Sequence, residues 1–387
     1  MNTGFAPQNK LSYPEYLLKS LIQITNNTSP TYNIGVFLDS VIRYVSLHHE
    51  LFGKYEGELM QKPNDHILSK TSGNFKTFLE GEELAPLIPL FILSHTAQGY
   101  GYLDEIGALY GLMWNTPALV STVALRAVGI SQDPYKTYIL KKGFEHVWNT
   151  IVKKEKFDIR FDTTIEKVQR NQEYVKIIYK KTTTKLRTEK CGFLIWTPPM
   201  TELLKYTSTP NPKEYSLFHS LVPHVFVSSL MREKGTIRNH PITYYRESLQ
   251  DKIEGAITAD MDTEGTLNYC EENCLGNLSQ YDEIVNTSRI LTVLQLQRNH
   301  TSETKSVQMV REHYETGFNA SEIEMLSTIS WEYFHKWGPE DLAKGYHWKV
   351  FEMQGLYRTW YTGASVSFES VKSVIEYNKL LLRQFGK

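Results

Sequence analysis

The residues best placed to do chemistry lie near the C-terminus, where a predicted strand passes through a small-residue turn into a helix. Residues 356–361 (LYRTWY) are aromatic and apolar, which favours a buried strand. Gly363 allows a turn without a Cβ clash, and the Ser365 and Ser367 hydroxyls can cap the next helix. Apolar spacing over 371–382 predicts that helix. A helix that starts after such a turn can bind an anion, because its free N–H groups and positive dipole end point the same way.

A second set of segments has the form of a helix followed by strands. Residues 142–153 place their apolar side chains on one face, which predicts a helix. The apolar period then changes to two at 157–161 (FDIRF) and 165–168, which predicts the first strands of a β-meander. The meander leads to a buried strand at 193–196 (FLIW), which Pro198-Pro199 ends.

These segments together resemble the flavin-containing amine oxidases and related FAD-dependent oxidoreductases. The resemblance rests on Tyr361-Thr362-Gly363-Ala364-Ser365, on Phe368-Glu369-Ser370-Val371 and on the helix–strand unit from Lys142 to Val168. It implies that the last strand ends beneath the flavin and that the last helix faces the ribityl-phosphate and the flavin C2 carbonyl.

The resemblance also implies specific contacts. The residues expected to contact FAD are Val168, Gly363, Ala364, Ser365, Phe368, Glu369, Ser370 and Val371. The residues expected to line the substrate site are Trp360, Tyr361, Tyr357 and Trp331, followed by Tyr333 and Trp337. No catalytic residue is assigned, because a flavin carries the hydride chemistry and needs little from protein side chains.

The chain departs from the family pattern in several places. The family begins with a strand, a G-x-G-x-x-G turn, a helix and an acidic residue, but here no G-x-G precedes Gly99-Tyr100-Gly101. That triplet lies in an aromatic loop rather than between a strand and a helix, so it fails the context test for a dinucleotide turn. Ala364 stands where the family has an acidic residue, and no lysine matches the one near flavin N5. The sequence therefore resembles a member whose first nucleotide-binding unit comes from a missing N-terminal segment or from a partner chain.

We expect an α/β fold with α+β elements: an incomplete FAD/NAD(P)-binding-like nucleotide domain and a mixed-sheet and helical substrate domain. The predicted blocks are helices at 1–135, a nucleotide-domain helix and meander at 136–200, a mixed-sheet domain at 201–340, and the final strand and helix at 341–387. Unpaired edges beside 193–196 should make the isolated chain poorly soluble unless its own N-terminal residues or a partner cover them.

The overall composition and net charge of the chain argue against several classes of protein. A net charge of −1 and 22% charged residues give no argument for nucleic-acid binding. The absence of a run of 18 apolar residues argues against a spanning helix. The start, MNTGFAPQNK, lacks the apolar core of a signal peptide, so we expect a cytoplasmic protein. Cys270 and Cys274 have no second pair at zinc spacing, so we expect no metal.

Three functional hypotheses follow. The first is an FAD-dependent oxidoreductase that oxidises a small organic substrate by hydride transfer to flavin. The second is a non-catalytic relative that has lost FAD binding and serves as a binding or scaffold protein. The third is an enzyme that uses its aromatic pocket without flavin. No residue distinguishes an amine from another oxidisable substrate.

Overall fold

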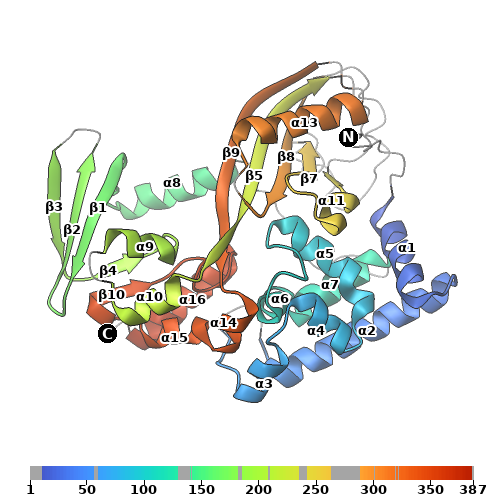
Figure 1. The fold of residues 1–387 in the computed structure, drawn as a ribbon, viewed down its shortest axis with the longest axis horizontal. Coiled ribbons are helices and arrows are strands. Elements are labelled where there is room, and N and C mark those ends of the chain that lie inside the picture. The colour runs from blue at the N-terminus through green and yellow to red at the C-terminus, as the bar shows by residue number, and fades with distance from the viewer. Residues whose placement is uncertain are drawn as a thin grey trace.

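The computed structural model describes residues 11–55, 60–129, 140, 142–181, 185–207, 210–234, 242–262, 288–299, 301–318, 320 and 322–385 (Figure 1). Cys270 and Cys274, considered above as half of a metal site, lie outside these ranges. Figure 1 shows a helical block, a small lobe with three strands, and a tall lobe with the long strands, all joined by the C-terminal helices. The mixed helix-and-sheet class agrees with the sequence prediction.

The helical block is the best-packed part of the chain. Its helices are α1 (Tyr13–Thr25), α2 (Pro30–Phe52), α3 (Asp65–Lys70), α4 (Phe75–Gly81), α5 (Ile88–Ser94), α6 (Ala108–Trp114) and α7 (Pro117–Ala127), with 3-10 turns η1 (Ala85–Leu87) and η2 (Thr96–Gln98). Ser12 and Glu15 form a capping box at α1. Gly53 ends α2 and donates its N–H to the His49 carbonyl oxygen at 2.8 Å. Phe37, Phe75 and Phe91 are fully buried in one core between these helices.

The small lobe holds the predicted meander. Helix α8 (Gly143–Glu155) leads to the antiparallel sheet β1 (Thr163–Arg170), β2 (Val175–Lys181) and β3 (Leu186–Cys191). The strand predicted at 157–161 does not form: these residues have an extended sequence pattern but no pairing partner among the residues that the structure describes, and Phe157 and Phe161 are exposed. Alternation alone cannot make a strand where no second strand supplies the hydrogen bonds.

Strand β4 (Leu194–Trp196) pairs in parallel with β10 (Thr359–Tyr361), which confirms that the two predicted segments share a sheet. The predicted strand at 356–361 is shorter than expected, because Leu356–Arg358 forms the 3-10 turn η4. The side-chain amide of Gln354 explains part of this shortening of the strand. It accepts the Tyr361 N–H at 2.8 Å and donates to the Tyr361 carbonyl oxygen at 2.7 Å, as a neighbouring strand would.

The tall lobe is a five-stranded antiparallel sheet in the order β6-β7-β8-β5-β9. Its strands are β5 (Val222–Lys234), β6 (Ile242–Tyr244), β7 (Ile257–Asp262), β8 (Arg289–Gln297) and β9 (Glu322–Lys336). The apolar and aromatic run 329–337 predicts a strand, and β9 starts seven residues before it. Helix α13 (Glu303–Gly317) covers one face of the sheet through Val310 and Tyr314, and the short helix α11 (Arg246–Asp251) precedes β7.

The remaining helices join the lobes. They are α9 (Met200–Tyr206), α10 (Pro212–Phe218), α14 (Pro339–Ala343), α15 (Tyr346–Glu352) and α16 (Val371–Phe385). The proline at 339 predicts a helix from Pro339 to Val350, but this helix is interrupted, because Gly345 adopts a left-handed conformation between α14 and α15. The four-block division of the chain stays a prediction. None of the helices among the described residues has the length and apolar character needed to span a bilayer.

Candidate functional site where the nucleotide-type segments meet the tall sheet

The turn after β10 is held against the end of β4. The Thr362 N–H donates to the Trp196 carbonyl oxygen at 3.0 Å, which extends the β4–β10 pairing by one bond. Gly363 has a φ of +94°, and a Cβ there would lie 2.6 Å from the Thr197 carbonyl oxygen. Glycine is thus required at this turn for backbone packing. A valine at 363 would disturb the junction of the two strands before it reached any ligand.

Helix α16 begins at Val371, as the apolar spacing predicted, but its cap is not one of the predicted serines. Ser370 caps it, because its Oγ accepts the Ser373 N–H at 3.1 Å. Ser365 and Ser367, the predicted caps, are buried within the preceding turn, where the Ser367 hydroxyl donates to the Gly363 carbonyl oxygen at 2.9 Å. The prediction of these caps was wrong, because the turn takes several more residues to bring the chain round.

The predicted FAD-contacting residues divide into two places. Gly363 to Val371 form one continuous turn and helix start, and Phe368 within it is buried. Val168 lies on another element, β1, where it is buried and bridges Thr207.

The predicted substrate residues do not share one face. Trp360 and Tyr361 are consecutive in β10, so their side chains point to opposite sides of the strand. Trp360 packs edge-on against Phe193, with ring centroids 5.8 Å apart. Trp331 is exposed on β9, and Tyr357 lies in the turn before β10 with a φ of 48°.

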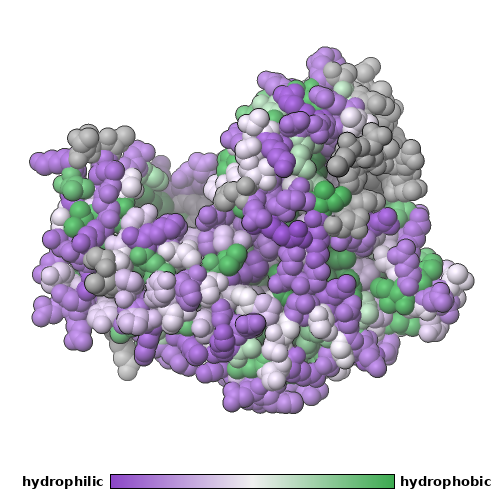
Figure 2. Space-filling view, viewed as in Figure 1, coloured by the Kyte–Doolittle hydropathy of each residue, from purple (hydrophilic) through white to green (hydrophobic). Residues whose placement is uncertain are grey.

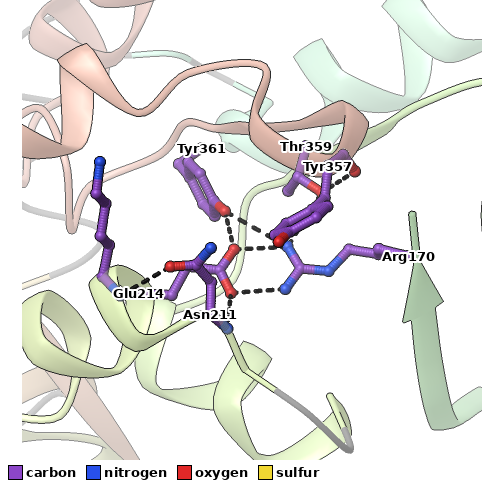
Figure 3. Close-up of polar contacts among 7 residues, drawn as sticks. Arg170, Asn211, Glu214, Tyr357, Thr359 and Tyr361 are labelled. Atoms are coloured by element: carbon purple, nitrogen blue, oxygen red, sulfur yellow. Dashed lines mark hydrogen bonds and ion pairs between the residues drawn. The ribbon is translucent and has the colours of Figure 1, made fainter. Parts of the chain in front are cut away.

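Tyr361 instead belongs to a buried ion-pair network (Figure 3). Its hydroxyl donates to Glu214 of α10, which also receives two bonds of 2.7 Å from the guanidinium of Arg170 at the end of β1. The charged side chains of this pair are 3% and 1% exposed. Arg170 also donates to the Thr359 hydroxyl at 3.1 Å, and Glu214 caps its own helix by accepting the Asn211 N–H. The network joins β1, α10 and β10.

The group with the most unusual chemistry is Lys336, the last residue of β9. Its side chain is buried, with Nζ 5.2 Å from the centre of the Phe334 ring. Burial lowers the pKa of the Lys336 ammonium to about 7, although the Glu105 and Glu369 carboxylates act in the opposite direction. A lysine with this pKa can take up or release a proton near neutral pH.

Glu369 faces Lys336 from the segment before α16. Its carboxylate accepts the Phe334 N–H at 3.1 Å. Burial raises the pKa of this carboxyl, although the Phe334 N–H and the Lys336 charge lower it. The last strand of the tall sheet and the start of the C-terminal helix thus present titratable groups to each other.

Aromatic rings enclose these two groups. Tyr100 donates its hydroxyl hydrogen to the Glu369 carbonyl oxygen at 3.0 Å and stacks on Tyr333 with centroids 6.1 Å apart. Phe368 stacks on Trp114 at 5.6 Å and meets the Tyr100 ring edge-on at 5.0 Å. Burial raises the pKa of both Tyr100 and Tyr333, so both hydroxyls stay protonated at neutral pH.

The Gly99-Tyr100-Gly101 triplet positions this enclosure. A Cβ at Gly99 would lie 2.9 Å from the Phe226 ring, and one at Gly101 would lie 2.4 Å from the His224 ring nitrogen Nε2. Both glycines also have positive φ. The triplet therefore lets the loop lie directly on β5, which carries Tyr100 into the junction.

Lys336 could not be identified from its sequence position. In the run Tyr333 to Trp337 (YFHKW) a lysine at a strand end reads as a solvent-exposed residue. The only signal was its aromatic surroundings on both sides, which is unusual for an exposed lysine. Its burial comes with the fold: the Phe334 ring beside it packs against Tyr100 and Phe368, which are remote in sequence.

Comparisons with known proteins place the fold. No family model and no curated protein sequence matches the chain. Among solved structures, a CLA-producing fatty acid isomerase from P. acnes matches with a TM-score of 0.66 at 20% identity, over 89% of this chain and 74% of that one. A double mutant of putrescine oxidase with redesigned cofactor binding matches with a TM-score of 0.55 at 9% identity, over 90% and 74%. A reduced UDP-galactopyranose mutase matches with a TM-score of 0.50 at 10% identity, over 79% and 64%.

The chain has the fold of the FAD-dependent amine oxidases and related flavoenzymes. This confirms the fold that the sequence resemblance implied. About a quarter of the isomerase chain has no counterpart here.

The residues present fit one end of FAD. The end of β10, the Gly363 turn and the capped start of α16 form a strand–turn–helix unit suited to the flavin and its phosphate. Within the ranges that the structure describes, the first strand is β1, so no strand leads into any of the helices α1 to α7. The described residues therefore hold no counterpart of a pyrophosphate-binding turn.

Proposed function

We propose that this chain is an FAD-dependent oxidoreductase of the amine-oxidase type that oxidises a small organic substrate by hydride transfer to flavin. The observation that carries the proposal is the junction of Lys336 and Glu369. A lysine from the tall sheet and a carboxylate from the start of α16 share one aromatic enclosure. Titratable groups with perturbed pKa values gather at functional sites more often than elsewhere. The fold shared with flavoenzymes over most of the chain supports the same function.

In this proposal the segment Gly363 to Val371 holds the flavin end of FAD, and Val168 lies toward the adenine. The positive end of α16 favours the negative charge of the cofactor, by about 0.3–1 kcal/mol for each unit charge. When bound, the flavin would accept two electrons as a hydride from the substrate.

Lys336 would hold the proton that the substrate loses. Near pH 7 a fraction of this lysine is neutral and can accept a proton at Nζ. Its Nζ lies 5.2 Å from the centre of the Phe334 ring, and burial keeps the pKa low. The Tyr100 hydroxyl already donates its hydrogen to the Glu369 carbonyl oxygen, so toward a polar substrate it could only accept a hydrogen bond.

A titration with FAD tests the cofactor site directly. We expect saturable quenching of flavin fluorescence by the purified chain. Ser370→Asp keeps a good helix cap but places a negative charge where the cofactor's charge would lie. It should raise the Kd for FAD about fivefold, the equivalent of about 1 kcal/mol.

Ser29→Asp is the matched control, because Ser29 caps α2 in the same way through the Tyr32 N–H. It should leave the Kd for FAD unchanged. Equal Kd values for Ser370→Asp and the wild type would place the flavin elsewhere. Lys336→Met should bind FAD like the wild type and lose turnover of candidate amines.

A second candidate function is a non-catalytic binding or scaffold role. The close packing of Phe368 against Trp114, Tyr100 and Phe334 favours it, because protein rings already fill much of the junction. A folded wild-type chain that shows no saturable FAD binding would support this function and contradict the first.

A further inference from the structure

The sheet of the small lobe has two unlike faces. Side chains along a strand alternate between faces, and Val168, Val175 and Tyr179 are buried on the inner one. We call the opposite face the basic face and define it by Lys167, Lys176, Lys180 and Lys190, which the strand register places together. Figure 1 shows this sheet at one end of the molecule, and Figure 2 shows mostly hydrophilic side chains over the small lobe with a few hydrophobic ones among them.

Two lysines of the basic face oppose each other directly. Lys176 of β2 and Lys190 of β3 are partners in the antiparallel register. Like charges at directly opposed positions destabilise a sheet. The Lys190 ammonium lies 4.1 Å from the centre of the Tyr174 ring, which keeps its charge on the sheet rather than out in solvent. The repulsion between these two lysines lowers the stability of the lobe, and an anionic surface laid over the face would relieve it.

The chain itself neutralises little of this charge. Glu166, at the bulge in β1, pairs with Lys180 at 2.6 Å. Lys167, Lys176 and Lys190 make no ion pair within the described part of the chain. From 166 to 190 the sequence has eight lysines and arginines and three glutamates, although the whole chain has a net charge of −1. Positive charge is therefore gathered in this lobe, and the net charge of the chain conceals it.

The side chains of the basic face favour one kind of anionic partner. None of the residues that the register places on this face is an arginine. Lysine is a point charge without the planar fork that reads a single phosphate or base, so the face suits charge that is spread over a surface. Ile178 lies between Lys176 and Lys180 on the same face, and Leu186 is 58% exposed beside them. Lysines mixed with exposed aliphatic side chains suit the interface of an anionic lipid bilayer.

We propose that the basic face docks onto the surface of a membrane that contains anionic lipids. The ammonium groups of Lys167, Lys176 and Lys190 meet the negative headgroups, and Leu186 enters the layer between them. The attachment lies in the plane of the interface and needs no spanning segment. It goes beyond the proposed function, because neither the flavin nor the Lys336 junction takes part in it.

Co-sedimentation of the purified chain with lipid vesicles tests this proposal. One set of vesicles is pure phosphatidylcholine, and the other also contains phosphatidylserine. At about 0.1 M salt we expect binding to the phosphatidylserine vesicles alone, and at about 1 M salt we expect that binding to disappear, because the screening length falls from about 10 Å to about 3 Å. A DNA duplex at the same phosphate concentration should leave the chain on the vesicles. Binding to both vesicles, binding to neither, or displacement by the duplex would each overturn the proposal.

Charge-matched variants locate the binding surface. Lys176→Gln/Lys190→Gln should weaken vesicle binding about thirtyfold, the equivalent of about 2 kcal/mol, because each lysine near an anionic membrane strengthens binding about fivefold. Lys19→Gln/Lys54→Gln makes the same change of charge at exposed positions of the helical block and should bind like the wild type. Equal losses in the two double variants would contradict a docking role for this face.

A single variant separates lost binding from lost folding. Lys190→Glu places opposite charges across the strands at the position facing Lys176. It should raise the urea midpoint slightly, because the repulsion becomes an attraction, and it should weaken vesicle binding at least as much as Lys176→Gln/Lys190→Gln does. Unchanged vesicle binding by Lys190→Glu would overturn the proposal. These readouts do not depend on flavin, so they stay separate from the FAD titration.

Discussion

Helices α2 and α8 have the same kind of amphipathic sequence and opposite surroundings. The apolar face of α2, with Phe37 and Tyr44, is fully buried in the helical block, whereas Phe144 and Trp148 of α8 are at least half exposed. The pattern shows only that a helix has an apolar face. Whether that face is covered depends on the other segments, and here only α2 has its neighbours within the described chain.

The largest effect on stability is expected when one phenylalanine in each of these two helices is truncated to alanine. Phe37→Ala should lower the free energy of unfolding by about 4 kcal/mol, because it leaves a cavity in a packed core. Phe144→Ala should change it by less than about 0.5 kcal/mol, because the ring packs on nothing that folding buries. Urea unfolding of both variants measures the difference. Similar losses of unfolding free energy in the two variants would show that the apolar face of α8 is covered in the isolated chain.

A second comparison sets the buried ion pair against an exposed one. Glu214→Leu should lower the free energy of unfolding by about 3 kcal/mol, because it leaves the Arg170 charge buried without its partner. Arg160→Met breaks the exposed pair with Glu189 and should leave the urea midpoint unchanged. The double variant Arg170→Met/Glu214→Leu should be more stable than Glu214→Leu alone. A double variant that is also less stable than the wild type would show that the pair itself stabilises the chain.

A smaller, pH-dependent effect should mark the junction. The folded-state pKa of Lys336, about 7, is lower than its value in the unfolded chain. Between about pH 7 and about pH 10 the unfolded chain therefore binds one more proton, and wild-type stability should rise by about 1.4 kcal/mol per pH unit. Below that window both states are protonated, and this slope disappears.

Lys336→Met removes this contribution. Its stability advantage over the wild type should shrink as the pH rises from about 7.5 to about 9.5, which urea unfolding at several pH values can follow. Lys344→Met, on the exposed side chain paired with Asp341, is the control and should show no such trend. A constant difference between Lys336→Met and the wild type would mean that the folded-state pKa of Lys336 is ordinary.

Local patterns predicted the local structure well. The Ser12–Glu15 spacing predicts a capping box, Gly53 predicts the end of α2, and the two-residue apolar period predicts the meander, all from short-range rules. The parallel pairing of 193–196 with the last strand followed from the family resemblance instead. The predictions at 157–161 and at the cap of α16 failed for a different reason. The segment 157–161 lacked a pairing partner among the described residues. The position of the α16 cap depended on how many residues the Gly363 turn needs to pass the Thr197 carbonyl.

The sequence by itself determined local features such as the capping box of α1 and the end of α2, because caps, glycines and apolar periods act over a few residues. It also determined the resemblance on which the flavoenzyme fold was predicted. Only the tertiary structure decided that Lys336 is buried, that Tyr361 belongs to an ion-pair network, and that the apolar face of α8 is bare. Burial and pKa depend on groups that meet across more than a hundred residues of chain, as Tyr100 and Glu369 do. The desolvation of a charged group depends on the folded residues around it, so no short stretch of sequence reveals it.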